Sequence, residues 1–156
     1  MRKIYQPYAV ILQQWLVFGP SGRNHRPDGL VIESYTRRLP QTTDASCHLK
    51  TLVRTEHLLG IDYTPHAAEC SGPACTTRGE NVLPCAIQPI QCRDVMVINH
   101  CFTNSLEDWA FRRCRGRGDS LEPYQERVFS DVASEAEIED TRATRFVPRL
   151  RALLGT

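Results

Sequence analysis

Proline residues interrupt one long stretch in the middle of this 156-residue chain, between residues 61 and 92. The prolines of this stretch are Pro65, Pro73, Pro84 and Pro89. A proline lacks the backbone N–H and has a fixed φ, so helix interiors and central strands exclude it. Short extended pieces around Val82 and Ile87 are therefore the most regular structure that we expect there. A segment of this length without secondary structure is unusual in a compact domain unless something holds it in place.

The same segment contains a histidine and four of the chain's seven cysteines. His66, Cys70 and Cys75 follow the spacing H-x3-C-x4-C, which is acceptable for one half of a structural zinc site. Cys85 and Cys92 are farther apart than a usual pair of zinc ligands, and Pro89 lies between them. The sequence thus supports zinc as a hypothesis, with His66, Cys70, Cys75 and one of Cys85 or Cys92 as ligands.

The cysteines also allow two alternatives to zinc. Disulfides would suit a proline-rich segment without regular structure, but they require an oxidising compartment and leave one of the seven cysteines unpaired. Buried reduced thiols behave as small apolar side chains, and scattered cysteines in an intracellular protein are usually of this kind. We favour the buried thiols.

The first residues of the chain allow two interpretations. Residues 7–18 predict a helix that ends before Gly19, although their β-branched content leaves a strand as the alternative. Residues 1–21 also resemble a weak signal peptide, but two glutamines interrupt its apolar run. We expect an intracellular protein of the cytoplasm or nucleus, or a secreted one if residues 1–21 are a signal peptide. No stretch is apolar over the length of a membrane span, so none is expected.

Turn residues mark two further elements before the proline-rich segment. Residues 30–36, LVIESYT, alternate between apolar and polar side chains and predict a strand. Ser46 is a candidate N-cap for a helix with apolar residues at helical spacing, and Gly60 stands where that helix would end.

Residues 94–102, DVMVINHCF, alternate and predict a strand. Its core-facing side chains are expected to be Met96, Ile98, His100 and Phe102. Asn104 or Ser105 then predicts the start of a helix over residues 106–114, with acidic residues near its start and arginines near its end.

Two more helices are predicted after this one. Ser120 is a candidate N-cap for the first of them, with Pro123 in its opening turn. Pro148 is expected to end or kink the last helix. Together these elements predict an α+β fold in a small single domain, residues 1–156, in which three to five helices pack on a few short strands. Its successive parts are residues 7–60, the irregular segment with a strand at 61–103, and the helical part at 104–156.

Arginine dominates the basic residues, because Lys3 and Lys50 are the only lysines among the 19 lysines and arginines of the chain. The formal net charge is only +1, so total charge does not predict binding to nucleic acid or membranes. The densest basic patch is a candidate binding site for phosphate or RNA, although acidic neighbours weaken its field. It also contains an Arg-Gly-Asp tripeptide, which resembles an integrin-binding motif. The residues of this candidate site are Arg112, Arg113, Arg115, Arg117 and Asp119.

No catalytic signature appears in the sequence. We therefore expect a small soluble binding or regulatory protein, stabilised by zinc if the metal hypothesis holds, with another protein as the favoured partner. Three alternatives remain. They are a secreted protein stapled by disulfides that displays the Arg-Gly-Asp tip, a thiol or acid/base enzyme, and a recently arisen or overprinted reading frame without an evolved site.

Overall fold

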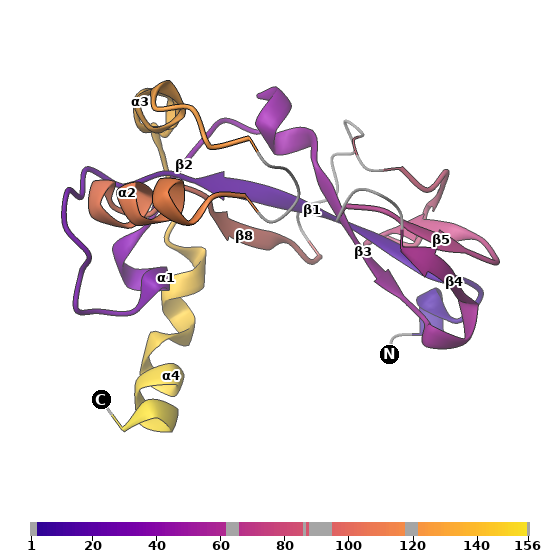
Figure 1. Ribbon diagram of the computed structural model, residues 1–156. Helices are drawn as coiled ribbons and strands as arrows, with labels where there is room; N and C mark the ends of the chain where they lie inside the picture. The colour runs from indigo at the N-terminus through magenta and orange to yellow at the C-terminus, as the bar shows by residue number, and fades with distance from the viewer. Residues whose placement is uncertain (1–2, 62–65, 86, 88–94, 118–121, 156) are drawn as a thin grey trace. The chain divides into compact units, whose positions relative to one another are not determined.

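The computed structural model describes residues 3–61, 66–85, 87, 95–117 and 122–155 (Figure 1). The elements are a mixed sheet, a separate two-stranded sheet and a set of α- and 3-10 helices. The expected α+β class is therefore confirmed at this level.

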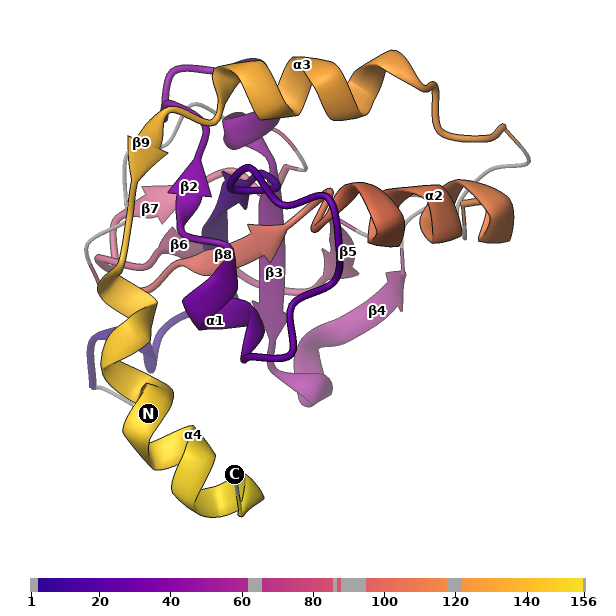
Figure 2. The ribbon, with the colours of Figure 1, turned by 90° about the vertical axis from the view of Figure 1, so that its left-hand side faces the viewer.

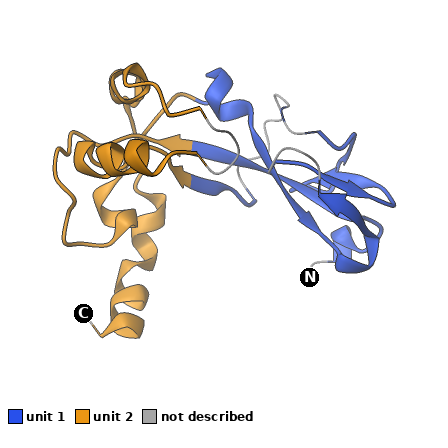
Figure 3. Ribbon diagram, viewed as in Figure 1, with its two compact units in different colours: residues 1–16, 41–99 blue, residues 17–40, 100–156 orange. Residues whose placement is uncertain are grey.

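The chain packs into two compact units, shown in Figure 3. Unit 1 comprises residues 1–16 and 41–99, and unit 2 comprises residues 17–40 and 100–156. Strand β1, Val10–Phe18, begins in unit 1 and ends in unit 2. The three successive parts expected from the sequence, residues 7–60, 61–103 and 104–156, do not coincide with these two units. That division stays a prediction.

In unit 1, β1 is a central strand. It pairs antiparallel with β3, Leu49–Val53, and parallel with β6, Ala74–Thr76. Strand β6 pairs in turn with β7, Asn81–Val82, as expected for the short extended piece around Val82. Nearly every side chain of β1 is buried, because a strand with neighbours on both edges and cover on both faces has no solvent-exposed side.

Two apolar clusters form around these strands. One contains buried Val10, Leu12 and Leu49, and the other contains buried Tyr5, Ile11 and Cys75. Successive residues of a strand point to opposite faces, which is why neighbours such as Val10 and Ile11 belong to different clusters.

A two-stranded sheet and short helices complete unit 1. Strand β4, Leu58–Ile61, pairs antiparallel with β5, Ala68–Cys70, with an irregularity between Leu58 and Gly60. The 3-10 helices are η1, Lys3–Tyr5, η2, Asp44–Cys47, and η3, Thr55–His57.

In unit 2, the end of β1 pairs with β2, Arg37–Arg38, and β2 pairs with β9, Ile138–Glu139. Strand β8, Ile98–Cys101, which begins in unit 1 and ends in unit 2, also pairs with β1. The helices of this unit are α1, Val31–Ser34, α2, Leu106–Arg115, α3, Arg127–Glu135, η4, Arg142–Phe146, and α4, Val147–Leu154.

Aromatic rings form much of the interior of unit 2. Trp109 of α2 is almost completely buried, and its ring lies 5.1 Å from that of Tyr124, 5.7 Å from that of Phe102 and 6.4 Å from that of Phe129. Burial of large aromatic side chains contributes strongly to stability. Helices α2 and α3 thus share one aromatic core with the residue that follows β8.

Three of the expected elements before residue 61 have the wrong type. Residues 10–18 form a strand rather than part of a helix, and the expected strand at residues 30–36 contains the short helix α1. Ser46 lies inside η2, and the expected helix that follows it is replaced by β3, η3 and β4. Short apolar runs fit helix and strand equally well, and here pairing with β1 decides in favour of strands.

The later elements agree better with expectation. Strand β8 covers Ile98–Cys101 of the expected strand, and Asn99 is exposed while Ile98 and His100 are partly buried. Ser105 is the N-cap of α2, as predicted, and accepts a hydrogen bond from the backbone N–H of Asp108.

The last two helices differ in their boundaries. Helix α3 begins at Arg127, after Pro123, and Ser120 lies outside the described residues. Pro148 neither ends nor kinks a helix, because it lies in the first turn of α4. A proline is tolerated there, since the first N–H groups of a helix have no intrahelical acceptor.

Candidate functional site

The expected zinc ligands lie in different surroundings within unit 1. Cys75 is buried with Tyr5 and Ile11, whereas Cys70 and Cys85 pack against the cluster that contains Val10 and Leu49. Because Cys75 belongs to one cluster and the other two cysteines to a second, the structure does not bring these three thiols together.

His66 lies beside β3, where its Nδ1 is 3.0 Å from the carbonyl oxygen of Leu49. Within the part of the chain that the structure describes, no group of three or more histidine, cysteine, aspartate or glutamate side chains is placed to hold a metal ion. Cys92 lies outside those residues. The zinc site stays a prediction.

Burial makes several thiols poor nucleophiles. It raises the pKa of Cys70, Cys75, Cys85 and Cys101, so each is less ionised at neutral pH than an exposed thiol. The six described cysteines are free thiols. The surroundings of these four are those of small apolar side chains, in keeping with the interpretation that the sequence favours.

Three rings gather in unit 1 in a way that sequence reasoning missed. The rings of Trp15, His48 and His66 lie 5.1 Å from one another in each pair. The Nζ atom of Lys50 lies 5.8 Å from the centroid of Trp15. Trp15 lies in β1, Lys50 in β3, His48 immediately before β3, and His66 just before β5. No regular spacing in the sequence relates these positions. The cluster holds His66 against the sheet by ring packing.

The expected arginine patch at the end of α2 is largely engaged in contacts within unit 2. Arg112 stacks over the ring of Phe102 and donates to its carbonyl oxygen, and Arg117 lies over the ring of Tyr124 at 5.3 Å. Arg113 lies 3.6 Å from the carboxylate of Glu126. Arginines held in this way are less available for phosphate than the sequence suggests.

Two residues of that patch differ from the rest. Arg115 is exposed, and Asp119 lies outside the described residues. The Arg-Gly-Asp interpretation therefore stays a prediction.

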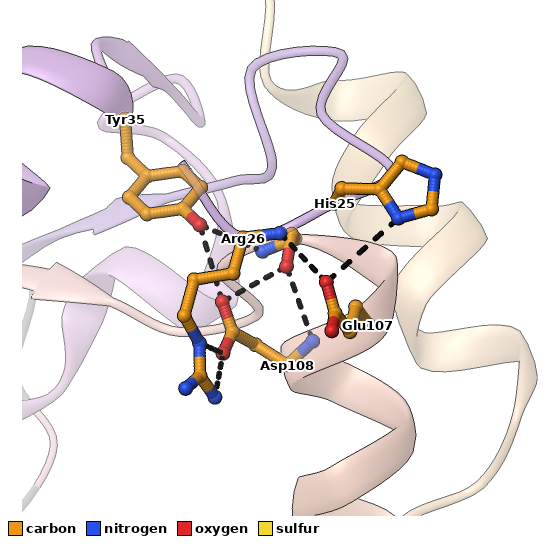
Figure 4. A network of polar contacts seen from close by, with 6 residues as sticks. His25, Arg26, Tyr35, Glu107 and Asp108 are labelled. Carbon is orange, nitrogen blue, oxygen red and sulfur yellow. Dashed lines mark hydrogen bonds and ion pairs between the residues drawn. The ribbon is translucent and has the colours of Figure 1, made fainter. Parts of the chain in front are cut away.

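A polar network joins the loop after β1 to the start of α2 (Figure 4). Both Nε and Nη2 of Arg26 contact one carboxylate oxygen of Asp108, at 2.7 and 2.6 Å. The other oxygen of Asp108 accepts from the hydroxyls of Ser105 and Tyr35, at 2.9 and 3.2 Å. Tyr35 is held by a second contact, since its hydroxyl also accepts from the backbone N–H of Ser105.

The electrostatics of the network follow from these contacts. Burial alone would raise the pKa of Asp108, but hydrogen bonds from Ser105 and Arg26 and the positive charge of Arg26 lower it below its ordinary value. Burial raises the pKa of Tyr35. Asp108 is thus a charged acceptor that already receives several donors, which suits a structural role better than acid–base chemistry.

Backbone contacts complete the same junction. The N–H groups of Leu106 and Glu107 donate to the carbonyl oxygens of Arg23 and Asn24, at 3.2 and 3.0 Å. The first N–H groups of an α-helix lack intrahelical acceptors, and here the loop supplies them. The network caps α2 and fixes the loop to it.

Strand β4 carries exposed apolar side chains that are not part of the buried core. Leu58, Leu59 and Ile61 are 42, 64 and 81% exposed. Large apolar side chains that are exposed singly are ordinary, but three exposed within one short strand mark that strand as a candidate interaction surface. We name these three residues the β4 surface.

Comparison with family models, curated proteins and solved structures finds no match to this chain. The helices formed by the described residues are all too short or too polar to cross a membrane. The functional interpretation therefore rests on the residues themselves.

Proposed function

We propose that the chain is a binding protein and that unit 1 docks an extended apolar segment of a protein partner along β4. The observation that carries this proposal is the exposure of the β4 surface. Burying a leucine or isoleucine side chain in a contact contributes about 1.5–3 kcal/mol, so three such side chains are a substantial source of affinity.

The backbone of β4 offers a second component of binding. Among the described residues, β4 pairs only with β5, so its other edge has no strand neighbour there. An exposed edge presents N–H and C=O groups that can pair with an added strand. Strand addition of this kind obtains affinity from main-chain hydrogen bonds and specificity from the side chains.

The chemistry of β4 favours an apolar peptide over other ligands. The strand has the sequence LLGI, without a charged or hydrogen-bonding side chain. Phosphate and carboxylate ligands would find no cation on this strand. The register of β4 with β5 shifts between Leu58 and Gly60, and such irregularities are common at sheet edges. An uncharged segment with alternating large apolar side chains is the occupant that fits.

Selection from a random peptide library displayed on phage, with the whole chain as bait, tests the proposal. We expect enrichment of peptides with alternating apolar side chains. Their affinity should fall at least tenfold in the variant Ile61→Lys, because a lysine in the contact removes apolar burial and adds a charge. The matched control is Leu83→Lys, since Leu83 is also 81% exposed but lies outside β4.

Two results would overturn the proposal. One is enrichment of peptides whose affinity is the same for Ile61→Lys and the wild type. The other is a dimer in light scattering that Ile61→Lys dissociates, since the occupant of β4 would then be a second copy of the chain. Circular dichroism of both variants checks that they remain folded.

The other functions expected from the sequence stay predictions. Nucleic-acid binding at the arginine patch would have to compete with the intramolecular contacts of Arg112, Arg113 and Arg117. A thiol enzyme would have to use one of the four cysteines whose pKa is raised by burial. Otherwise its nucleophile would have to be Cys47, Cys92 or Cys114. A cooperative unfolding transition would argue against a reading frame without an evolved fold.

A further inference from the structure

A helical segment in unit 2 exposes apolar side chains that its own unit leaves uncovered. The 3-10 helix η4 leads directly into α4 (Figure 2). Phe146, Leu153 and Leu154 of this segment are 48, 72 and 61% exposed. Other residues of the segment are partly buried within unit 2. They are Ala143, Thr144, Val147 and Leu150.

The large apolar residues of this segment form a stripe. Phe146, Leu150 and Leu153 follow the spacing i, i+4, i+7, and Leu154 lies one turn beyond Leu150. Residues at this spacing share one face of an α-helix. Leu150 lies between Leu153 and Leu154 on this face and is partly buried, whereas Leu153 and Leu154, one turn farther along the helix, are exposed.

Arginines flank this stripe, and no acidic residue occurs from residue 141 to residue 156. Two of the four arginines in this range form ion pairs within unit 2. Arg145 and Arg149 are exposed, and the guanidinium of Arg145 lies 4.7 Å from the centroid of Phe146. A cation beside an exposed aromatic ring is suited to a boundary between an apolar and an anionic layer.

We propose that η4 and α4 bind the surface of a bilayer that contains anionic phospholipids. In this arrangement Phe146, Leu153 and Leu154 enter the region between headgroups and acyl chains. Arg145 and Arg149 pair with phosphate and carboxylate groups of the headgroups. Helices with an apolar stripe and basic flanks bind bilayer interfaces in this way.

Two observations favour a bilayer over an acidic groove on a protein. Every described side chain from Arg151 onward is exposed, so the end of the segment is open to a planar interface. The charges of residues 141–156 are all of one sign, which matches the uniform negative potential of an anionic leaflet. This inference concerns unit 2 and is independent of the function proposed for unit 1.

Co-sedimentation of the whole chain with vesicles tests the inference. We expect binding to vesicles of phosphatidylcholine with about 30% phosphatidylserine, and at least tenfold weaker binding to pure phosphatidylcholine. Binding should weaken several-fold when salt is raised from about 0.1 to 0.5 M, since salt screens the attraction. Leu153→Glu should reduce partitioning at least tenfold, and its matched control is Leu83→Glu on unit 1.

A charge test separates the arginines of the segment from the arginine content of the whole chain. Removing both exposed arginines, in Arg145→Gln/Arg149→Gln, should weaken binding about 20-fold at low salt. Removing two exposed arginines elsewhere, in Arg115→Gln/Arg127→Gln, should change it less than threefold. Equal loss in both double variants, unchanged binding of Leu153→Glu, or no binding of the wild type to anionic vesicles would each overturn the inference.

Discussion

Arg38 and Asp140 form a buried ion pair across 102 residues of chain, with 2.7 Å between Nε and a carboxylate oxygen. Arg142 donates to the same carboxylate through Nε and Nη2, at 2.8 and 2.6 Å. The backbone N–H of Asp140 donates to the carbonyl oxygen of Thr36 at 2.7 Å. These contacts join the ends of β2 and β9, so Asp140 holds the edge of the sheet in unit 2.

The variant Asp140→Asn should lower the free energy of unfolding by about 3 kcal/mol, because it leaves the buried guanidinium of Arg38 without its counter-charge. Chemical denaturation followed by circular dichroism measures this change. Glu137→Gln is the control, since Glu137 is exposed and close in sequence, and a change within about 0.5 kcal/mol is expected. Equal effects of the two substitutions would show that the ion pair contributes nothing specific.

Acid should remove the same contribution. Hydrogen bonds from Arg142 and Arg38 lower the pKa of Asp140 far below its ordinary value, although burial opposes them. The carboxyl of the unfolded chain has its ordinary pKa, about 3.9, so below this pH the unfolded state binds a proton that the folded state does not. The stabilisation is complete above about pH 5 and decreases as the pH falls toward the folded pKa. Urea midpoints of the wild type and Asp140→Asn should therefore converge as the pH is lowered from about 5 to about 2.5, and a constant difference would contradict this account.

Gly19 should not tolerate alanine. A Cβ atom at this position would lie 2.7 Å from Cβ of Ala136 and 3.3 Å from the carbonyl oxygen of Val132. Both contacts are with the end of α3 or its cap, which cannot move without breaking that helix end, so Gly19→Ala should cost about 1–3 kcal/mol. Gly29→Ala is the control, because its added Cβ meets nothing closer than 3.6 Å. Thermal unfolding of the two variants should differ by several degrees.

The zinc hypothesis has a direct test. The hypothesis predicts about one zinc per chain in native mass spectrometry of protein purified without chelator, and a loss of the circular dichroism of helix and strand on chelation. Cys70→Ser should weaken zinc binding, whereas Cys114→Ser should not, since Cys114 is exposed and lies in unit 2. Absence of metal, together with a fold that chelator leaves unchanged, would rule out the site.

Local signals predict some elements well. Ser105, the acidic residues after it and the arginines near residue 114 mark both ends of α2, because capping and the helix dipole act within one turn of the chain. The prolines of residues 61–92 predict short extended pieces around Val82 and Ile87, which form β7 and a bridge to His48. The expectation of no further regular structure there is wrong, because β5 and β6 also lie in this segment, and β6 pairs with both β1 and β7.

The candidate sites are harder to predict from the sequence. The arginines of residues 112–117 are close in the sequence, but their contacts with Phe102, Tyr124 and Glu126 depend on how α2 packs in unit 2. The ring cluster of Trp15, His48 and His66 brings together three distant positions. The exposure of β4 has no signal in the sequence, because the spacing of its leucines also fits the apolar face of a helix.

By itself the sequence determined what depends on neighbouring residues, namely the cap of α2 and the mixed composition of helix and strand. Tertiary structure alone decided that residues 10–18 form a strand, because the same apolar run satisfies a buried helix or a buried strand. Its partners, β3 and β6, lie far along the chain, and only their hydrogen bonds favour the extended form. The pairing of Arg38 with Asp140 has the same origin, since an ion pair across 102 residues has no local signal.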